Sequence, residues 1–443
     1  MVEALVTRLV PDATRWAPIW RSSLPSATTA TNSWPWLFVS GLLLGASFTL
    51  FYYFNEYSAV SRTLSAAVDS GSSTSVHAGE GKPHRVVVDL SGKCDLLNGE
   101  WIPNPFAAAY TNSCRFIANT QNCITNGRSN TSYTNWRWKP QDCDVPLFDP
   151  DKFLSAMRNK VWALVGDSIF RNFAESFICI LSKPEEPVEV YHDERYEFKV
   201  WRFPSYNFTV SLIWSRFVSK AEMYNHDISE MHSVFLLHTD VLDAKWADQY
   251  STFDYVVVGG GGHWYLRNST FFYLEKNTIV SCHYCDTRSF PEMGVDAVYR
   301  KMLNSVFRFV AGSAHKPVVI FATWSPDHYE NGEWNTRGTC NRATPYRRGE
   351  YDGKEVGRAM RRIELEEFER AALLGQGSAR LKLFDIYRLM VLRPDAQPDR
   401  YWGGAQQVGR RKRQWPVYDC LHWCLPGAVD AWSDLIMELV LNE

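Results

Sequence analysis

Short apolar runs alternate with stretches of helical spacing from residue 151 to the C-terminus. Residues 161–165 (VWALV) are a continuous apolar run, and apolar side chains then recur at positions 170, 173, 177 and 181, which is typical of a strand, a turn and a helix. Further buried strands are expected at residues 208–214, 255–258, 318–322 and 381–386, and helices at residues 296–310, 354–374 and 428–441. Strands separated by helices favour parallel pairing, so the pattern predicts an α/β fold with a mainly parallel sheet covered on both faces.

A long apolar segment lies near the N-terminus. Residues 34–54 (WPWLFVSGLLLGASFTLFYYF) carry no charge and are long enough to span a bilayer as one helix with aromatic side chains at both ends. A cleaved signal peptide would have a shorter apolar run and a small-residue cleavage site, so we interpret the segment as an uncleaved transmembrane signal anchor. Arginines precede it at positions 8, 15 and 21, and the positive-inside bias then places residues 1–33 in the cytosol as a short tail.

The remainder of the chain, which this orientation places in a lumen, changes composition twice. Residues 55–93 are rich in Ser, Gly, Ala and Thr and are expected to form a flexible stem. Residues 94–150 are dense in Cys, Asn, Trp and Tyr with weak periodicity, as expected of a loop-rich segment cross-linked by disulfides. Residues 151–443 carry the alternating pattern, and we expect residues 94–443 to fold as one globular unit.

Cysteines and glycosylation sequons are confined to the predicted luminal side. The N-x-S/T sequons lie at Asn130, Asn207 and Asn268. The ten cysteines are Cys94, Cys114, Cys123, Cys143, Cys179, Cys282, Cys285, Cys340, Cys420 and Cys424. An even cysteine set together with sequons indicates an oxidising secretory compartment. The simplest interpretation is a single-pass type II Golgi membrane protein with a luminal catalytic domain.

Four of these cysteines also have the spacing of a zinc site. Cys282 and Cys285, combined with Cys420 and Cys424, would supply four thiolates. In an oxidising lumen cysteines form disulfides instead, so we predict no metal site.

The charge balance excludes one class of partner. The chain has 47 basic and 49 acidic side chains and a net charge of -2, which does not favour binding to nucleic acid. Aromatic residues make up 14% of the chain and include 18 Trp, which suits either a large core or stacking surfaces for sugar rings.

Two short motifs carry candidate chemistry. Gly166-Asp167-Ser168 lies between the first predicted strand and its helix, where a helix N-terminus offers free N–H groups to an oxyanion. Asp419 and His422 precede the last helix, and a serine nucleophile needs such a base with a carboxylate that fixes its tautomer. Structural alternatives exist for both motifs, namely helix capping by Asp and Ser and a histidine wedged between disulfides.

Longer motifs resemble those of a known family. They are CDLLNGEWIPN (94–104), WRWKPQDCD (136–144), GDSIFRNFAESFICILS (166–182) and DCLHWCLPGAVDAWSDLI (419–436). The region from about residue 94 onward is similar to the plant trichome-birefringence-like polysaccharide O-acetyltransferases. That resemblance implies an SGNH-hydrolase-like α/β/α fold with Ser168 as nucleophile, His422 as general base and acid, and Asp419 as its orienting carboxylate. It implies ping-pong transfer of an acetyl group from acetyl-CoA or another carrier to a wall polysaccharide, with no bound cofactor.

The resemblance also implies disulfides Cys94–Cys143 and Cys114–Cys179, and leaves the other six cysteines to cross-link the C-terminal half. A bridge to Cys420 or Cys424 would hold the Asp419 and His422 turn rigidly, so reduction would lower activity as well as stability.

The chain departs from the family pattern at the oxyanion hole. SGNH-type enzymes usually place an Asn there, whereas residues 258–264 read VGGGGHW. Either backbone N–H groups of Gly260, Gly261 and Gly262 act with that of Ser168, or Arg171 or Asn172 completes the hole. The glycine run does not predict a phosphate-binding loop, because no Lys-Ser/Thr follows it.

Candidate binding residues each have a structural alternative, and the alternative is favoured for Trp136, Trp138 and the basic run. Trp136 and Trp138, which flank Arg137, either stack on pyranose rings or belong to the core of a disulfide-rich segment. His263 and Trp264 either line the sheet edge as catalytic support or a sugar platform, or are a packed aromatic and a satisfied histidine. The basic run at residues 410–413 (RRKR) is either a solvated loop or an attraction for an anionic donor.

Within the family the chain is most similar to the xyloglucan-acetylating branch, which implies a galactosyl or glucosyl 6-hydroxyl as acceptor. A mannan or xylan acceptor would use the same triad. An acetyl esterase would also use these three residues, with water as acceptor, and a non-catalytic wall-polymer binding protein would not need all three intact.

Overall fold

A computed structural model describes residues 94–106, 108–224, 233–259, 262–285, 289–374, 380–403 and 418–441. These residues belong to one compact unit, Val86–Glu443. The predicted cytosolic tail, signal anchor and stem lie outside the described residues. Within the described ranges, no helix combines the length and apolar character needed to cross a bilayer.

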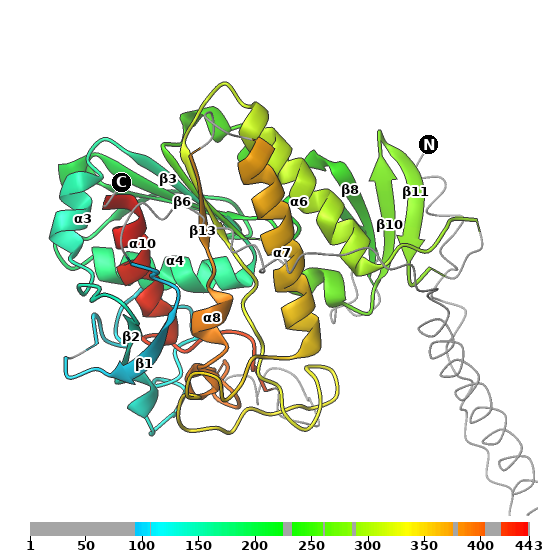
Figure 1. Ribbon diagram of the computed structural model, residues 1–443. Coiled ribbons are helices and arrows are strands. Elements are labelled where there is room, and N and C mark those ends of the chain that lie inside the picture. The colour runs from blue at the N-terminus through cyan, green and yellow to red at the C-terminus, as the bar shows by residue number, and fades with distance from the viewer. Residues whose placement is uncertain are drawn as a thin grey trace, which may run out of the picture. The chain divides into compact units, whose positions relative to one another are not determined.

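A seven-stranded sheet forms the centre of the fold (Figure 1). Five parallel strands lie in the order β13 (Arg380–Phe384), β12 (Val318–Ala322), β9 (Tyr255–Gly259), β3 (Val161–Gly166) and β6 (Phe208–Trp214). Two antiparallel strands, β5 (Phe198–Phe203) and β4 (Val188–His192), extend the sheet beyond β6. The predicted mainly parallel sheet is therefore confirmed.

Helices cover both faces of this sheet (Figure 1). Phe321 and Phe384 point to opposite faces, because Phe384 is paired with the neighbouring Ala322. Phe321 contacts α6 and α7, whereas Phe384 contacts Trp432 of α10, which also packs on α4. The four helices are α4 (Ser168–Leu181), α6 (Val295–Gly312), α7 (Glu355–Leu374) and α10 (Ala431–Leu441). The fold is thus an α/β/α sandwich, as the resemblance implies.

A second sheet lies beside α6 and was not predicted from the sequence (Figure 1). Its strands have the order β11 (Thr278–His283), β10 (Thr270–Glu275), β8 (Val234–Leu242) and β7 (Ser219–Tyr224). Strands β8 and β10 are parallel, and the outer pairs are antiparallel. Apolar runs at residues 234–237 in β8 and 271–274 in β10 are the sequence signals for this sheet.

Short helices complete the described fold. The α-helical ones are α3 (Pro150–Ala156), α5 (Ala244–Ala247) and α8 (Tyr387–Met390). The 3₁₀ turns are η2 (Ser132–Thr134), η3 (Pro204–Tyr206), η4 (Tyr250–Thr252), η5 (Gly262–Leu266), η6 (Pro394–Ala396) and η7 (Ala428–Asp430). The helix expected at residues 428–441 therefore begins as a 3₁₀ turn and becomes α-helical at Ala431.

The Cys/Trp-rich segment contains little regular structure, as expected. Strands β1 (Gly99–Pro103) and β2 (Trp136–Pro140) form an antiparallel pair, and the rest is turns and loops. Disulfides Cys94–Cys143 and Cys114–Cys179 are both present, and a third joins Cys123 to Cys424. The indole of Trp101 donates to the Leu389 carbonyl at 2.9 Å, so the segment is bound to the sandwich by hydrogen bonds as well as by disulfides.

Asp430 joins three parts of the chain at the start of the last helix. Its carboxylate accepts hydrogen bonds from the Tyr110 hydroxyl at 2.7 Å, the Ser176 hydroxyl at 2.6 Å and the Gly427 N–H at 2.9 Å. Burial raises the pKa of Asp430 to about 6, and the three donors offset part of this rise. The Cys/Trp-rich segment, α4 and the C-terminal helix therefore share one buried acceptor.

Two glycines at the carboxyl edge of the sheet are required by close packing. A Cβ at Gly259 would lie 2.0 Å from Phe170 on α4, and one at Gly166 would lie 2.7 Å from the same ring. The helix that begins with the candidate nucleophile therefore rests directly on the backbone of β3 and β9.

We predict that Gly259→Ala lowers the free energy of unfolding by about 1–3 kcal/mol, because the added methyl group forces the Phe170 ring out of a packed position. Urea unfolding followed by circular dichroism measures the change. Gly312→Ala is the matched control, since a Cβ at Gly312 meets nothing within 4 Å. Equal effects of the two substitutions would contradict the packing argument.

Candidate active site

Ser168 follows β3, which lies at the topological switch point of the sheet, where the connections begin to run in opposite directions from the central strand. Strand β3 has β6 on one side and β9 on the other, and the chain reaches β6 before β9. Ligands of open α/β sheets bind at the carboxyl ends of strands at such a switch point. Asp167 is the N-cap of α4 and accepts the Ile169 N–H at 3.0 Å. Asp167 thus supplies the capping interaction, and Ser168 is the first residue of the helix with a partly exposed side chain.

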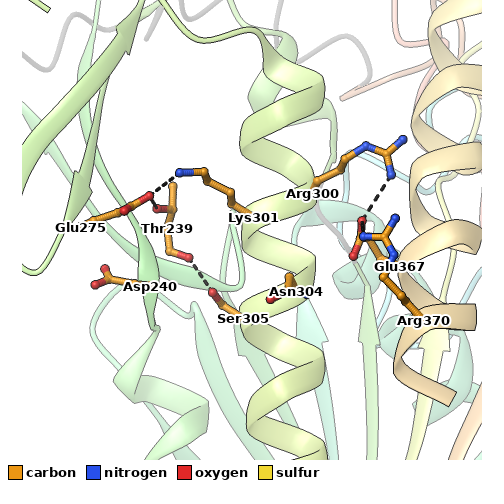
Figure 2. Close-up of a pocket in the computed structure, with 9 residues that line it drawn as sticks. All are labelled: Thr239, Asp240, Glu275, Arg300, Lys301, Asn304, Ser305, Glu367 and Arg370. Atoms are coloured by element: carbon orange, nitrogen blue, oxygen red, sulfur yellow. Dashed lines mark hydrogen bonds and ion pairs between the residues drawn. The ribbon is translucent and has the colours of Figure 1, made fainter. Parts of the chain in front are cut away.

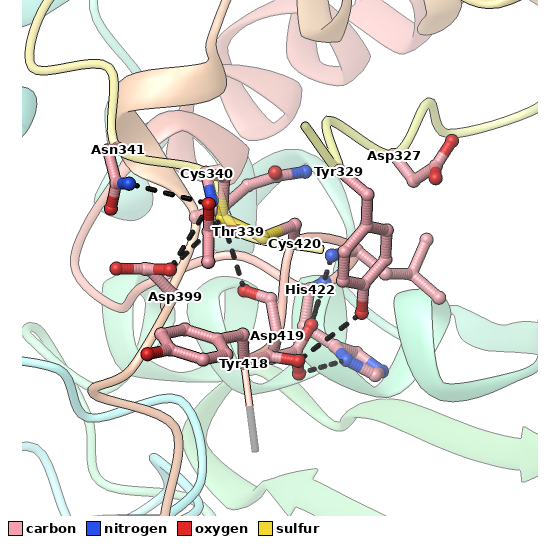
Figure 3. Close-up of a disulfide and its surroundings, with 12 residues drawn as sticks. Asp327, Tyr329, Thr339, Cys340, Asn341, Asp399, Tyr418, Asp419, Cys420 and His422 are labelled. Carbon is pink, nitrogen blue, oxygen red and sulfur yellow. Dashed lines mark hydrogen bonds and ion pairs between the residues drawn. A yellow bond between two sulfur atoms is a disulfide. The ribbon is translucent and has the colours of Figure 1, made fainter. Parts of the chain in front are cut away.

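Asp419 and His422 form a closed turn in which the carboxylate is fully used (Figure 3). One oxygen, Oδ1, accepts the backbone N–H groups of Leu421 at 3.0 Å and His422 at 2.9 Å. The other, Oδ2, accepts from Nδ1 of the imidazole at 2.7 Å. A carboxylate only accepts, so the proton of a neutral His422 is on Nδ1, and Nε2 has its lone pair available as a base.

The pKa values of this pair move apart. Burial favours the neutral imidazole, but the charge and hydrogen bond of Asp419 outweigh it and raise the pKa of His422 above its usual value. Burial would raise the pKa of Asp419, but the imidazole and the two backbone N–H groups lower it. Asp419 is therefore ionised whenever His422 is able to take up a proton.

Three contacts fix this turn to the body of the protein (Figure 3). The disulfide Cys340–Cys420 joins it to the loop after β12, and Cys123–Cys424 joins its other end to the Cys/Trp-rich segment. Asp399 and Asp419 exchange backbone hydrogen bonds at 2.7 and 3.0 Å. Both Cys420 and Cys424 are thus bridged, and disulfides hold the turn of Asp419 and His422 from two sides.

Asn172 connects the turn to the helix of Ser168. It lies four residues after Ser168, one helical turn along the same face of α4. Its Oδ1 accepts the Trp423 N–H at 2.7 Å, and its Nδ2 donates to the Trp423 carbonyl at 3.2 Å. The side chain is fully buried, so Asn172 is a positioning residue and not the oxyanion-hole donor considered above. The i+4 spacing from Ser168 is the sequence signal for this role.

The charges of Arg171 and Asp167, at the start of α4, both act on the pKa of His422: Arg171 lowers it and Asp167 raises it. Nε2 of His422 is shielded from solvent and has no hydrogen-bond partner among the described residues. Nε2 therefore keeps its lone pair available as a base.

His263 belongs to the same edge of the sheet. Its Nε2 donates to the Ser325 carbonyl at 2.7 Å, and its ring packs on Trp324 with 4.1 Å between centroids. Burial lowers the pKa of His263, and the charge of Asp167 opposes this shift. The indole of Trp423 donates to the Ser325 hydroxyl at 3.3 Å. His263 thus lies in the network around the triad with its ring already packed.

The other residues considered for the oxyanion hole are the glycines of the run and Arg171. Gly260 and Gly261 lie outside the described residues. A Cβ at Gly262 would lie 1.9 Å from the Trp324 ring, so close packing is sufficient to require glycine there. The Arg171 guanidinium lies 4.9 Å from the centroid of Trp214, and its Nε is 3.9 Å from Glu175. Arg171 stays a candidate donor, since it lies on the first turn of α4.

The predicted sugar platform on β2 is wrong for Trp138. This side chain is buried, donates to the Leu96 carbonyl at 2.8 Å and packs edge-on against Trp101. Trp136 is half-buried against the core, and Arg137 lies between the two on the same strand. The core alternative holds for Trp138 because the β1–β2 pair buries its indole face.

Trp264 is also unavailable as an open platform. It is 8% exposed, and its ring is contacted by the guanidinium groups of Arg267 at 3.8 Å and Arg216 at 4.9 Å. The RRKR run at residues 410–413 lies outside the described residues.

The cysteines of the alternative zinc site have separate partners. Cys282 is bonded to Cys285, whereas Cys420 and Cys424 are bonded to Cys340 and Cys123. These sulfurs are in disulfides, so they offer no thiolates to a shared metal. The three sequon asparagines, Asn130, Asn207 and Asn268, are all exposed.

A pocket of about 330 Å³ lies away from Ser168, between β8, β10, α6 and α7 (Figure 2). Its charges neutralise one another, because Glu275 pairs with Lys301 and Glu367 pairs with Arg300 at 3.3 Å and Arg370 at 2.7 Å. None of the predicted site residues lines this pocket, so we do not assign the active site to it.

Comparisons with known proteins agree with the geometry. Residues 145–439 match the GDSL/SGNH-like acyl-esterase family found in Pmr5 and Cas1p, and residues 92–144 match the PMR5 N-terminal domain. The chain is similar to protein trichome birefringence-like 26 of Arabidopsis thaliana, with 47% identity over 80% of this chain and 78% of the relative. It is also similar to xyloglucan O-acetyltransferase 1 of Arabidopsis thaliana, with 38% identity over 78% and 80% of the two chains. Xyloglucan O-acetyltransferase 4 of Populus trichocarpa is 36% identical over 81% and 83%.

We predict that Asp419→Asn lowers kcat by about 10⁴-fold, because the amide no longer fixes the Nδ1–H tautomer. The acid limb of the kcat/KM profile of the residual activity moves to lower pH. The reason is that Asp419 raises the pKa of His422, so without its charge the imidazole loses its proton at lower pH. Asp399→Asn, a buried neighbour that does not contact the imidazole in the described structure, is the control and leaves the limb in place. If the acid limb of the kcat/KM profile does not move in Asp419→Asn, Asp419 does not raise the pKa of a catalytic His422.

Proposed function

Because the chain belongs to the GDSL/SGNH-like acyl-esterase family found in Pmr5 and Cas1p, and within it to the trichome-birefringence-like proteins, we propose that it is a polysaccharide O-acetyltransferase. The proposed acceptor is xyloglucan, with a galactosyl or glucosyl 6-hydroxyl as the acetylated group. The observation that carries the proposal is the Asp419–His422 turn held against the first turn of α4 by Asn172. Relatives named as xyloglucan O-acetyltransferases support the acceptor.

The first half-reaction forms an acetyl-serine. The Ser168 oxygen attacks the carbonyl carbon of the acetyl donor while Nε2 of His422 takes the hydroxyl proton. The bond between the carbonyl carbon and the leaving group then breaks, and the imidazolium returns its proton to that group. Asp419 keeps the remaining proton on Nδ1 and stabilises the imidazolium during these steps.

The second half-reaction reverses these roles. A sugar hydroxyl gives its proton to Nε2 of His422 and attacks the carbonyl carbon of the acetyl-serine. The bond to the Ser168 oxygen breaks, and that oxygen receives the proton from the imidazolium. The products are an acetylated sugar and free Ser168, and the proposed steps use neither a metal ion nor a redox cofactor.

The negative charge of both tetrahedral intermediates develops beside the N-terminus of α4. The helix begins at Ser168, so its first backbone N–H groups and the partial positive charge of the helix end lie at the reacting centre. The Arg171 guanidinium, on the same turn, supplies further positive charge. Together they take the place of the Asn that is missing from the glycine run.

The proposed setting is the Golgi lumen. Residues 34–54 would anchor the chain in the membrane as a type II protein, with residues 1–33 in the cytosol and the stem at residues 55–93. Five disulfides in the described part of the chain suit an oxidising compartment. The acetyl donor is acetyl-CoA or another acetyl carrier.

We predict that the full-length protein, expressed in a eukaryotic secretory system, adds acetyl groups to xyloglucan oligosaccharides in the presence of a donor. Ser168→Ala lowers this activity by about 10⁴-fold or more, because no acetyl-enzyme forms. Mass spectrometry of xyloglucan, mannan and xylan oligosaccharides measures the acetyl gain. Pre-acetylated oligosaccharides without donor report acetyl loss.

The outcomes separate the candidate functions. Acetyl gain on mannan or xylan alone would change the proposed acceptor from xyloglucan to that polymer and would leave the proposed mechanism unchanged. Loss without gain would make the protein an acetyl esterase. Full activity of Ser168→Ala would contradict the triad.

A further inference from the structure

Guanidinium groups and indole rings alternate in a chain of contacts that begins beside Ser168. Five successive contacts join six side chains, which we call the Arg–Trp row: Arg171, Trp214, Arg216, Trp264, Arg267 and Trp334. The distances from guanidinium carbon to ring centroid along the row are 4.9, 5.7, 4.9, 3.8 and 6.0 Å. Each distance is within the range of cation–π attraction, so each contact stabilises the positions of the two side chains that it joins.

The inner end of the row lies at the reacting centre. Arg171 is on the first turn of α4, three residues after Ser168. Trp214 is the last residue of β6 and pairs in register with Gly166, two residues before Ser168. The row therefore starts at the carboxyl edge of the two central strands where the acetyl-serine would form.

The outer end of the row is open to solvent. Trp334 is 43% exposed and lies in the loop that follows β12. Backbone hydrogen bonds between Glu330 and Thr339, at 2.7 and 2.9 Å, close this part of the loop. The next residue is Cys340, whose disulfide to Cys420 joins the loop to the catalytic turn. The loop that carries Trp334 is thus joined covalently to the turn of His422.

We propose, on the basis of the acetyltransferase function proposed above, that the Arg–Trp row binds the acceptor polysaccharide along successive sugar units outward from the acetylated one. The exposed indole of Trp334 matches the C–H surface of a pyranose ring, and the guanidinium and indole N–H groups of the inner row donate to sugar hydroxyls. Trp334 contacts a sugar unit remote from the reacting hydroxyl.

The polar atoms of the row favour a ligand with many hydrogen-bond acceptors. Nε of Arg171, Nε1 of Trp214 and Nε of Arg216 are donors without a hydrogen-bond partner among the described residues. Unpartnered buried donors are unfavourable, and a small rotation of these side chains toward sugar hydroxyls satisfies them.

Carboxylates beside the row offset part of its positive charge. Glu197 lies 3.3 Å from Arg216 and also pairs with Lys245, while Glu175 lies 3.9 Å from Arg171. Burial raises the pKa of Glu175 to about 7, so Glu197 provides most of this offset. Stacking on indole occupies the guanidinium faces and leaves their edges to donate hydrogen bonds.

The test measures binding separately from catalysis. Xyloglucan, mannan and xylan oligosaccharides of increasing length are titrated calorimetrically into the full-length Ser168→Ala protein. We expect Trp334→Ala in this background to weaken the longest bound oligosaccharides about tenfold and the shortest ones little, because only long chains reach the outer ring. Trp334→Phe restores most of the affinity. Arg267→Lys keeps the charge but loses stacking, and it weakens the same oligosaccharides.

Arg158→Ala is the matched control. Arg158 lies 5.2 Å from the ring of Tyr206, just before the start of β6 and therefore at the opposite edge of the sheet from Trp214. Oligosaccharide affinity is unchanged in this variant. If Trp334→Ala binds every oligosaccharide as the parent does, the row does not bind the acceptor.

Kinetics with Ser168 present distinguish the two substrates. Trp334→Ala raises KM for long acceptors more than it lowers kcat. A raised KM for 4-nitrophenyl acetate or acetyl-CoA, with acceptor binding unchanged, would assign the row to the donor and overturn the proposal. Absence of acetyl transfer in the parent protein would refute the proposed function, while the calorimetric result would still decide whether the row binds sugar.

Discussion

The buried Asp419 carboxylate is the constraint on which the site depends. A carboxylate removed from water is stable only when its oxygens are hydrogen-bonded, and Asp419 receives three N–H groups from a turn of four residues. Those three bonds exist only if the turn is closed, and the closed turn is what orients the imidazole. Two disulfides, the Asp399 bridge and Asn172 all act on this same short segment, which keeps the catalytic base in one position.

Close packing at the carboxyl edge of the sheet determines the position of Ser168 at the start of α4. Phe170 occupies the space that side chains at Gly166 and Gly259 would need, and Trp324 does the same at Gly262. Helix α4 therefore approaches the strands closely, and Ser168 is fixed by backbone contacts more than by its own side chain. Gly259 and Gly262, the two described glycines of the run that invites comparison with a phosphate loop, leave space for the Phe170 and Trp324 rings.

The described disulfides connect segments that the sheet alone does not hold. Cys114–Cys179 and Cys123–Cys424 bind the Cys/Trp-rich segment to α4 and to the catalytic turn, and Asp430 adds hydrogen bonds from Tyr110 and Ser176. The Cys/Trp-rich segment is therefore linked covalently both to α4 and to the end of the turn that contains His422. Two of its tryptophans, Trp101 and Trp138, donate to backbone carbonyls and pack on each other.

The α/β class and the central strands and helices follow from the amino-acid sequence, because periodicity and turn chemistry are local properties of the chain. Short motifs also singled out Ser168, His422 and Asp419 as candidates, and the Asp419–His422 hydrogen bond is present in the structure. Only the tertiary structure decided which tryptophans are core, what Asn172 binds and how six of the cysteines pair. Asn172 and Trp423 are separated by 251 residues, and Cys123 and Cys424 by 301. The second sheet also depends on distant contacts: its two central strands are parallel, its outer strands are antiparallel to them, and Phe217, Phe235 and Phe271 bury one another. Burial and partnership arise from contacts between distant residues, which no local pattern encodes.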